Sequence, residues 1–149
     1  MTLLRDEVLT ILKQQENDLS GEEISRRLGV SRMAVSNAVK ALRSEGYEID
    51  SATNRGYRLR KSADKLSAGE LYSFLPEERR KLVRCFDQID STNSYLKREA
   101  VNGAEEGLCA VANEQTAGRG RSGRSFFSAA DCGIYLLCCC ALIAVRNTP

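Results

Sequence analysis

Glycine and arginine alternate in the segment EQTAGRGRSGRSFF, which runs from Glu114 to Phe127. The alternation covers residues 118–121, and a second Gly-Arg pair follows at 123–124. Glycine lets the backbone come close to a ligand, and each guanidinium presents a planar fork of donors to carboxylate or phosphate oxygens. The segment therefore predicts an anion-binding loop, and its chemistry suits a carboxylate that is being activated by a nucleotide.

Other interpretations of this loop account for less of its sequence. Its glycines fit G-x-G-x-x-G, but residues 113–117 separate the preceding strand from the first glycine, and no helical period follows the last. A P-loop would need Gly-Lys-Ser/Thr, which does not follow. A flexible basic loop is the simplest alternative, and an RGG-like nucleic-acid segment is disfavoured because the motif occurs once.

The composition indicates a folded protein with a small net charge and therefore a weak overall electrostatic field. The chain has 149 residues, 42% of them hydrophobic, and 22 basic against 20 acidic side chains leave a net charge of +2. A polyanionic partner must therefore meet a local basic patch. The N-terminus lacks the pattern of a secretory signal, and the apolar run at 133–145 is too short for a membrane helix. We expect a cytoplasmic protein without a membrane partner.

The six cysteines predict neither a metal site nor a disulfide framework. There is no histidine and no C-x-x-C pair, so no metal-ligand set is predicted. Neighbouring side chains in the run 138–140 point in different directions, which disfavours bonds among these three. The thiols are expected to be reduced and partly buried.

Three helices are predicted in the first part of the chain, over residues 3–15, 21–28 and 32–45. Apolar residues recur at helical spacing in each, and Ser20 and Ser31 precede the second and third helices as N-caps. A short turn that contains glycine joins these two helices, which is typical of a helix-turn-helix.

A β-hairpin follows the third helix. Strand residues at 49–52 and 57–60 flank the turn 53–56, and five basic residues without an acidic one lie between Arg26 and Arg43. A winged helix with this charge is expected to bind DNA as a dimer on a two-fold operator. The simplest alternative is a three-helix packing module with a solvated polar face. The side chains expected to meet bases or phosphates are Arg32, Met33, Ser36, Asn37, Lys40 and Arg55.

The second part of the chain predicts strands with an intervening helix, and we place the boundary so that the domains cover residues 1–63 and 64–149. A short helix capped near Ser67 comes first. Strands are expected at 83–89 and 108–112, with a helix from about Asn93, and the apolar run 133–145 suggests a buried central strand. The fold class is α+β, with a winged helix-turn-helix domain before an α/β domain.

Together these segments resemble the bifunctional bacterial biotin protein ligases, which also repress the biotin operon. The wing RGYRL, the segment IDSTNSYL and the loop EQTAGRGRSGRSFFS with the later GIYL carry the resemblance, which covers roughly residues 1–137. The resemblance implies a class II synthetase-like catalytic domain that uses biotin and ATP, with Mg²⁺ accompanying the ATP. It also implies operator DNA, a biotin carboxyl-carrier protein of acetyl-CoA carboxylase and a homodimer as partners.

The resemblance also assigns the site. Ser91, Thr92 and Asn93 would line the biotin pocket, although a Ser-Thr-Asn sequence by itself is more often a helix cap. Gln115, Arg119, Gly120 and Arg121 would hold biotin and the adenylate. Arg119 and Arg121 would act in catalysis by neutralising charge that develops between the carboxylate and the α-phosphate.

The family's ligases continue well beyond the segment that this chain matches. Their later strands, a Lys-Trp-Pro-Asn-Asp segment and a C-terminal barrel-like domain have no counterpart here, so the resemblance implies an incomplete catalytic domain. We expect its site to lack one wall and the dimer-forming sheet surface, and its last strand to expose a hydrophobic edge. A DNA-binding regulator with an inactive ligase remnant is the alternative function.

Overall fold

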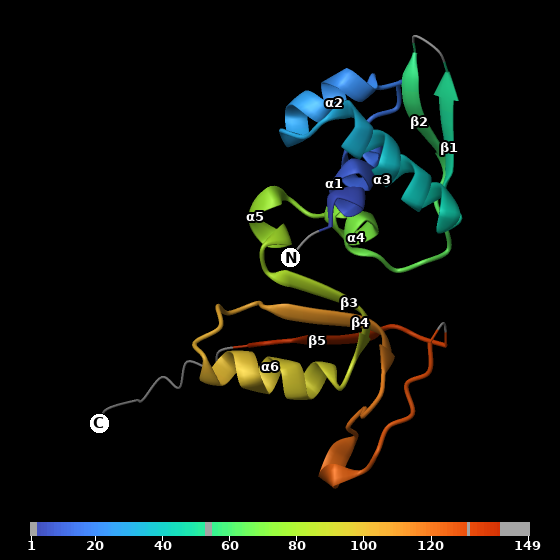
Figure 1. Cartoon of the computed structure of the whole chain (residues 1–149). Helices are drawn as coiled ribbons and strands as arrows, with labels where there is room; N and C mark the ends of the chain where they lie inside the picture. The colour runs from blue at the N-terminus through green and yellow to red at the C-terminus, as the bar shows by residue number, and fades with distance from the viewer. Residues whose placement is uncertain (1–2, 53–54, 131, 141–149) are drawn as a thin grey trace. The chain divides into compact units, whose positions relative to one another are not determined.

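The computed structural model describes residues 3–52, 55–130 and 132–140, and the chain forms two compact units. The first unit is Met1–Pro76 and the second is Glu77–Pro149. Figure 1 shows helices and a two-stranded hairpin in the first unit, and a sheet with a helix on one face in the second. The predicted α+β class is confirmed.

Three helices form the core of the first unit: α1 (Leu4–Lys13), α2 (Gly21–Leu28) and α3 (Arg32–Ser44). The two predicted caps are confirmed, because Ser20 accepts from the amide of Glu23 and Ser31 accepts from that of Ala34. The buried faces of the helices meet in one hydrophobic cluster with the hairpin. Its members include Val8, Leu9, Leu12, Ile24, Val35, Val39, Leu42, Tyr47 and Ile49.

The hairpin consists of the antiparallel strands β1 (Glu48–Ala52) and β2 (Gly56–Lys61). Part of the predicted turn, residues 53–54, lies outside the described residues. Arg43 at the end of α3 donates to the backbone oxygen of Ile49 at 2.6 and 2.9 Å. On the other side of the hairpin, Tyr57 in β2 exchanges backbone hydrogen bonds of 2.7 and 2.9 Å with Leu19, which precedes α2. The hairpin is therefore held at its base to α3, and along β2 to the loop between α1 and α2.

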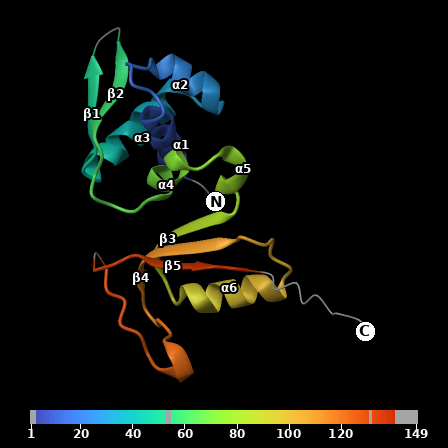
Figure 2. The same cartoon turned by 180° about the vertical axis from the view of Figure 1, so that it is seen from behind.

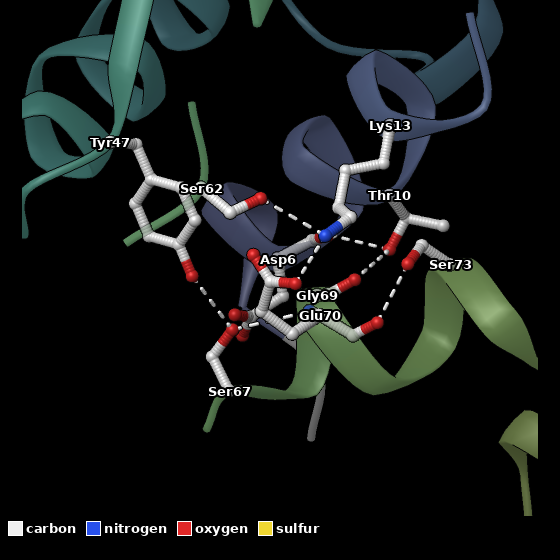
Figure 3. A network of polar contacts seen from close by, with 9 residues as sticks. All are labelled: Asp6, Thr10, Lys13, Tyr47, Ser62, Ser67, Gly69, Glu70 and Ser73. Carbon is white, nitrogen blue, oxygen red and sulfur yellow. Dashed lines mark hydrogen bonds and ion pairs between the residues drawn. The ribbon is translucent and has the colours of Figure 1, made fainter. Parts of the chain in front are cut away.

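A fourth helix, α4 (Ala68–Phe74), packs against α1 through a polar network (Figure 3). Lys13 on α1 donates to Ser62 at 3.1 Å and forms an ion pair with Glu70 on α4, and both charged side chains are 14% exposed. Ser67 caps α4 by accepting from the amide of Glu70, and its hydroxyl contacts that of Tyr47 at 3.2 Å. Because burial is the main influence, the pKa of Tyr47 rises to about 12, and its hydroxyl stays protonated.

The docking of α4 places the division between the units further along the chain than the boundary we predict at residues 63–64. The structure divides the chain after Pro76. The sequence predicts the short helix α4 but not its packing partner, because its attachment depends on Lys13, far away in sequence. Gly69 allows the close approach, because a Cβ there would lie 2.9 Å from the backbone oxygen of Asp6.

Substitution of Lys13 by methionine is expected to destabilise the first unit by about 2 kcal/mol, because the half-buried Glu70 carboxylate loses its counter-ion. Urea unfolding followed by far-UV circular dichroism measures the change. The double variant Lys13→Met with Glu70→Leu is the control, since it removes both charges and should regain most of the loss. Equal instability of the single and double variants would contradict a role for the ion pair.

The second unit is built around a three-stranded sheet with the order β3-β4-β5. After the short helix α5 (Glu77–Arg80), strand β3 (Val83–Ile89) runs parallel to β4 (Cys109–Gln115), and helix α6 (Thr92–Val101) makes the crossover. Strand β5 (Tyr135–Cys138) is antiparallel to β4. Figure 2 shows α6 along one face of the sheet, where Leu96, Leu108 and Ala110 form a small core.

The prediction of a buried central strand in the apolar run 133–145 is wrong for the residues that the structure describes. Within them, β4 is central and β5 is the outer strand. Ile134 is 67% exposed and Leu136 is 56% exposed, so this strand has one apolar face towards solvent. Hydrophobicity alone misled here, because it does not report how many neighbours a strand has. In the described part of the chain, helices that could cross a membrane are absent.

Candidate functional site

The arginine loop, defined as residues 116–128, is an ordered ribbon and not a free connection. It leaves β4 at the end of the sheet, where the amides of Thr116 and Ala117 donate to Ile89 and Asp90 at 2.9 and 2.8 Å. Its two arms then pair with each other: the amide of Phe126 donates to Gly118, and that of Gly120 donates to Arg124, both at 2.8 Å. These hydrogen bonds fix the backbone conformation of the loop that carries the arginines.

Gly118 lies where the two arms cross. It is buried, and a Cβ at this position would lie 2.7 Å from Ser128 Oγ and closer still to the backbone oxygen of Phe126. Approaches below 3.0 Å are essentially never seen for real Cβ atoms. The first glycine of the motif is therefore required by the loop's own closure, whereas our sequence interpretation reserved glycine for close approach to a ligand.

Gln115 connects the loop to the start of α6. Its side-chain oxygen accepts from the amide and the hydroxyl of Thr92 at 2.8 and 3.0 Å, and its nitrogen donates to Ser128 Oγ at 2.9 Å. The oxygen of this amide therefore bonds to the helix start and its nitrogen to the loop. Gln115 thereby sets the position of the loop relative to the helix N-terminus.

The N-terminus of α6 is fixed by two further contacts. Ser91 is 1% exposed and caps the helix by accepting from the amide of Ser94 at 3.4 Å. Arg98, two turns along the helix, pairs with Asp90 at 2.9 Å. Because Arg98 donates to it, the pKa of the Asp90 carboxyl lies below its usual value. Helix, strand end and loop consequently meet at one edge of the sheet.

These parts line an open cavity of about 980 Å³. Six of the seven predicted ligand-binding residues line it: Thr92, Asn93, Gln115, Arg119, Gly120 and Arg121. The seventh, Ser91, is outside the lining and serves as the helix cap. A cavity of this size admits a small molecule of several rings, and its walls combine two guanidinium groups with amide and hydroxyl groups.

Part of the cavity lining is apolar, and our sequence interpretation assigned no role to it. Phe126, Phe127 and residues 132–137 contribute to it. Phe127 is 88% exposed and Phe126 is 54% exposed, and the Phe126 ring meets that of Tyr135 edge to face at 6.4 Å. The only signal in the sequence was two adjacent aromatic residues directly after a basic loop. A lining that combines apolar side chains with guanidinium groups suits a ligand with a nonpolar body and an anionic end.

Comparison with protein families agrees with this arrangement. A helix-turn-helix domain profile matches residues 5–58, which contain α2, α3, nearly all of α1 and most of the hairpin. The profile of the biotin/lipoate A/B protein ligase family matches residues 85–146, which contain the whole cavity lining from Thr92 onward. The chain combines a helix-turn-helix domain with a biotin/lipoate protein ligase domain. The match of this ligase domain continues past residue 137, where we expected the resemblance to end.

The chain is also similar to three proteins that are named bifunctional ligase/repressor BirA. The chain is 37% identical to that of Bacillus subtilis (strain 168) over 135 residues, which cover 89% of this chain and 42% of the relative. It is 36% identical to that of Salmonella typhimurium and 33% identical to that of Escherichia coli (strain K12), each over 117 residues, 78% of this chain and 35% of the relative. The chain therefore spans less than half the length of these ligase/repressor relatives.

The helix-turn-helix domain presents the polar face predicted for DNA. Val35, Ala38 and Val39 turn into the core, whereas the opposite face of α3 is open. On that face Arg32, Met33, Asn37 and Lys40 are exposed, Ser36 is half-buried, and Arg55 is exposed beside the wing turn. Met33 is 68% exposed, which is unusual for an apolar side chain and leaves it free to contact a base.

Proposed function

We propose that this chain supplies the operator-binding domain and the arginine-loop side of the adenylating site of a biotin protein ligase. The carrying observation is a single cavity whose lining includes Arg119 and Arg121 together with Thr92, Asn93 and Gln115. The proposal draws support from the match to the ligase family and from relatives that are named bifunctional ligase/repressors. Such a protein works in the cytoplasm, where its substrates are.

The proposed reaction has two steps. The carboxylate of biotin attacks the α-phosphate of ATP, a P–O bond to pyrophosphate breaks, and biotinoyl-adenylate forms. The amine of a carrier lysine then attacks the acyl carbon, and AMP leaves. The carrier is the biotin carboxyl-carrier protein of acetyl-CoA carboxylase, and Mg²⁺ accompanies the ATP.

The chain's own residues would act mainly by placing charge. Arg119 and Arg121 lie on a ribbon that is already closed, so little reorganisation is needed when the carboxylate and the phosphate meet. Bidentate donors reduce the repulsion between these two anions and stabilise the charge that builds up on the phosphate oxygens. Asn93 offers an amide to the polar part of the biotin ring, while the apolar wall contacts its aliphatic chain.

Substitution of Arg121 by alanine is expected to weaken binding of biotin with ATP, and retention of the adenylate, by about tenfold to a hundredfold, because a charge-assisted hydrogen bond is lost. Calorimetry on the 149-residue chain and pyrophosphate release measure both. Arg124→Ala is the matched control: it removes the same charge from the same loop at a residue outside the cavity lining. Equal losses in the two variants would contradict a specific role for Arg121.

The first unit is proposed to bind operator DNA through α3 and the wing. Asn37→Ala should relax the preference of the protein for one base at one position of the operator. Lys40→Ala should instead weaken binding to all DNA sequences alike, and reduce the slope of log K against log salt concentration by about one. Titration of labelled duplexes at several salt concentrations separates the two outcomes. If Lys40→Ala leaves the salt slope unchanged, Lys40 does not contact phosphate. A homodimer on a two-fold site belongs to this proposal.

A regulator that binds DNA without ligase activity is the second candidate function. The observation that favours it is that the first unit has a closed core, while β5 presents an apolar face to solvent. The two functions differ in one result. If biotin and ATP do not change the affinity for DNA, and the chain releases no pyrophosphate from ATP, the result supports a DNA-binding regulator without ligase activity.

A further inference from the structure

Two cysteines of the second unit lie directly opposite each other on neighbouring antiparallel strands. Cys109 begins β4, Cys138 ends β5, and the two are register partners. The amide of Cys109 donates to the backbone oxygen of Leu82 at 2.7 Å and so points away from β5, while the amide of Cys139 donates to Leu108 at 2.8 Å; Cys109 and Cys138 are therefore a non-hydrogen-bonded pair. The Cα atoms of a non-hydrogen-bonded pair are about 4.5 Å apart, and its two side chains leave the sheet on the same face.

This placement meets the requirements of a disulfide, whose Cα atoms lie about 4.4–6.8 Å apart. Both thiols are free in the structure, with Cys109 partly buried and Cys138 exposed. We propose that Cys109 and Cys138 form a cross-strand disulfide on reaction with a low-molecular-weight disulfide of the glutathione type.

The other cysteines near this position fit less well. Cys139 packs against the core formed by Leu96 and Leu108, on the face of the sheet that α6 covers. Cys140 shares the face of Cys138 but is displaced along the strand, and a diagonal pair has its Cα atoms about 7–8 Å apart. The run of three cysteines therefore has one member aligned with Cys109.

The reaction is a thiol–disulfide exchange in two steps. The Cys138 thiolate attacks one sulfur of the small disulfide RSSR, one RS⁻ leaves, and a mixed disulfide forms on Cys138. Cys109 then loses its proton and attacks Cys138 Sγ, and the second RS⁻ leaves. Two cysteine sulfurs are oxidised and RSSR is reduced to two thiols, so excess thiol reverses the reaction.

The order of the steps follows from exposure. Burial, with smaller contributions from Cys138 and Cys140, raises the pKa of the Cys109 thiol to about 11. Cys109 is therefore a poor first nucleophile, and the exposed Cys138 meets the oxidant first. The closing step is expected to be the slower one.

The bond would act on the wall of the cavity. It would join β4 to the outer strand β5, which contributes Tyr135, Leu136 and Leu137 to the cavity lining. It would also close a covalent loop that contains the whole arginine loop. Restriction of the unfolded chain predicts a rise in Tm of about 5 °C or more on oxidation.

The test uses the 149-residue chain, reduced and then equilibrated with oxidised glutathione. After alkylation, trypsin separates the two cysteines, because Cys109 lies in residues 99–119 and Cys138 in residues 125–146. We expect mass spectrometry to find these peptides joined within one chain, and reduction to release them. Complete alkylation of Cys109 after oxidation, or a link found only in covalent dimers, would overturn the proposal.

Two single variants identify the partner. Cys138→Ser should leave residues 99–119 unlinked and abolish the rise in Tm, and because Cys138 is exposed its fold should match that of the parent chain by circular dichroism. Cys139→Ser, changed at the adjacent residue on the other face, should keep the link. If Cys138→Ser still shows a link to the remaining cysteines, the register pair is not the reactive one.

Discussion

Gly56→Ala is expected to lower the free energy of unfolding of the first unit by about 4 kcal/mol, and to abolish DNA binding with it. Gly56 starts β2 with a φ of +99°, a conformation that side chains other than glycine rarely adopt. An added Cβ would also lie 2.7 Å from Ser20 Cα and closer still to the backbone of Leu19. Relief of this overlap requires the wing to leave the α1–α2 loop, and the Leu19–Tyr57 hydrogen bonds are lost with it.

The matched control for this variant is Gly46→Ala. Gly46 has a similar φ of +95°, but a Cβ there would lie 3.6 Å from Ala63 Cβ, an ordinary contact. Its expected cost is therefore the conformational strain alone, about 1–2 kcal/mol. Urea unfolding of both variants isolates the overlap with Leu19, and equal costs would contradict the importance of that contact.

Gly118→Ala is expected to open the arginine loop at a cost of about 3 kcal/mol and to abolish binding of biotin with ATP. The added methyl group would occupy the place where Phe126 and Ser128 close the ribbon. The hydrogen bond from Gln115 to Ser128 is then lost, and so is the fixed position of the loop relative to Thr92. Amide exchange at Phe126 measures the opening, and about 3 kcal/mol corresponds to roughly hundredfold faster exchange.

Gly120→Ala is the control in the same loop. A Cβ at Gly120 would meet Arg124 at 3.4 Å, and the φ of Gly120 is −88°, so the loop should close as before. Exchange at Phe126 should stay within about threefold of the parent chain. Binding can still fall, because Gly120 lines the cavity and a methyl group there would change the lining. Fast exchange in Gly120→Ala, or slow exchange in Gly118→Ala, would contradict the assigned roles.

Gly118 and Gly120 have different roles: Gly118 allows the loop to close, and Gly120 lines the cavity. Glycine and arginine alternate because the two residue types do different tasks. The buried glycine lets two backbone arms cross, and the arginines between the arms are held facing one cavity. A loop of the same composition without the crossing would keep its charge but lose the direction in which that charge points.

Much of the fold was determined by the sequence itself, since local interactions decide it. Serine caps at 20 and 31, apolar spacing along α1 to α3 and the strand 83–89 are all properties of short segments, and the structure confirms each. The family resemblance likewise depends on short motifs, and the family comparisons agree with it. For the same reason, six of the seven residues that we predict to bind the ligand could be selected before the structure showed that they line one cavity.

The tertiary structure alone decided which distant segments meet. Lys13 pairs with Glu70, Gln115 with Ser128 and Cys109 with Cys138, and no local pattern marks any of these pairs. The same holds for β5, whose apolar sequence suggested a central strand although it lies, like β3, at an edge of the described sheet. Hydrophobicity and spacing report what a segment prefers, whereas its neighbours depend on how the whole chain packs.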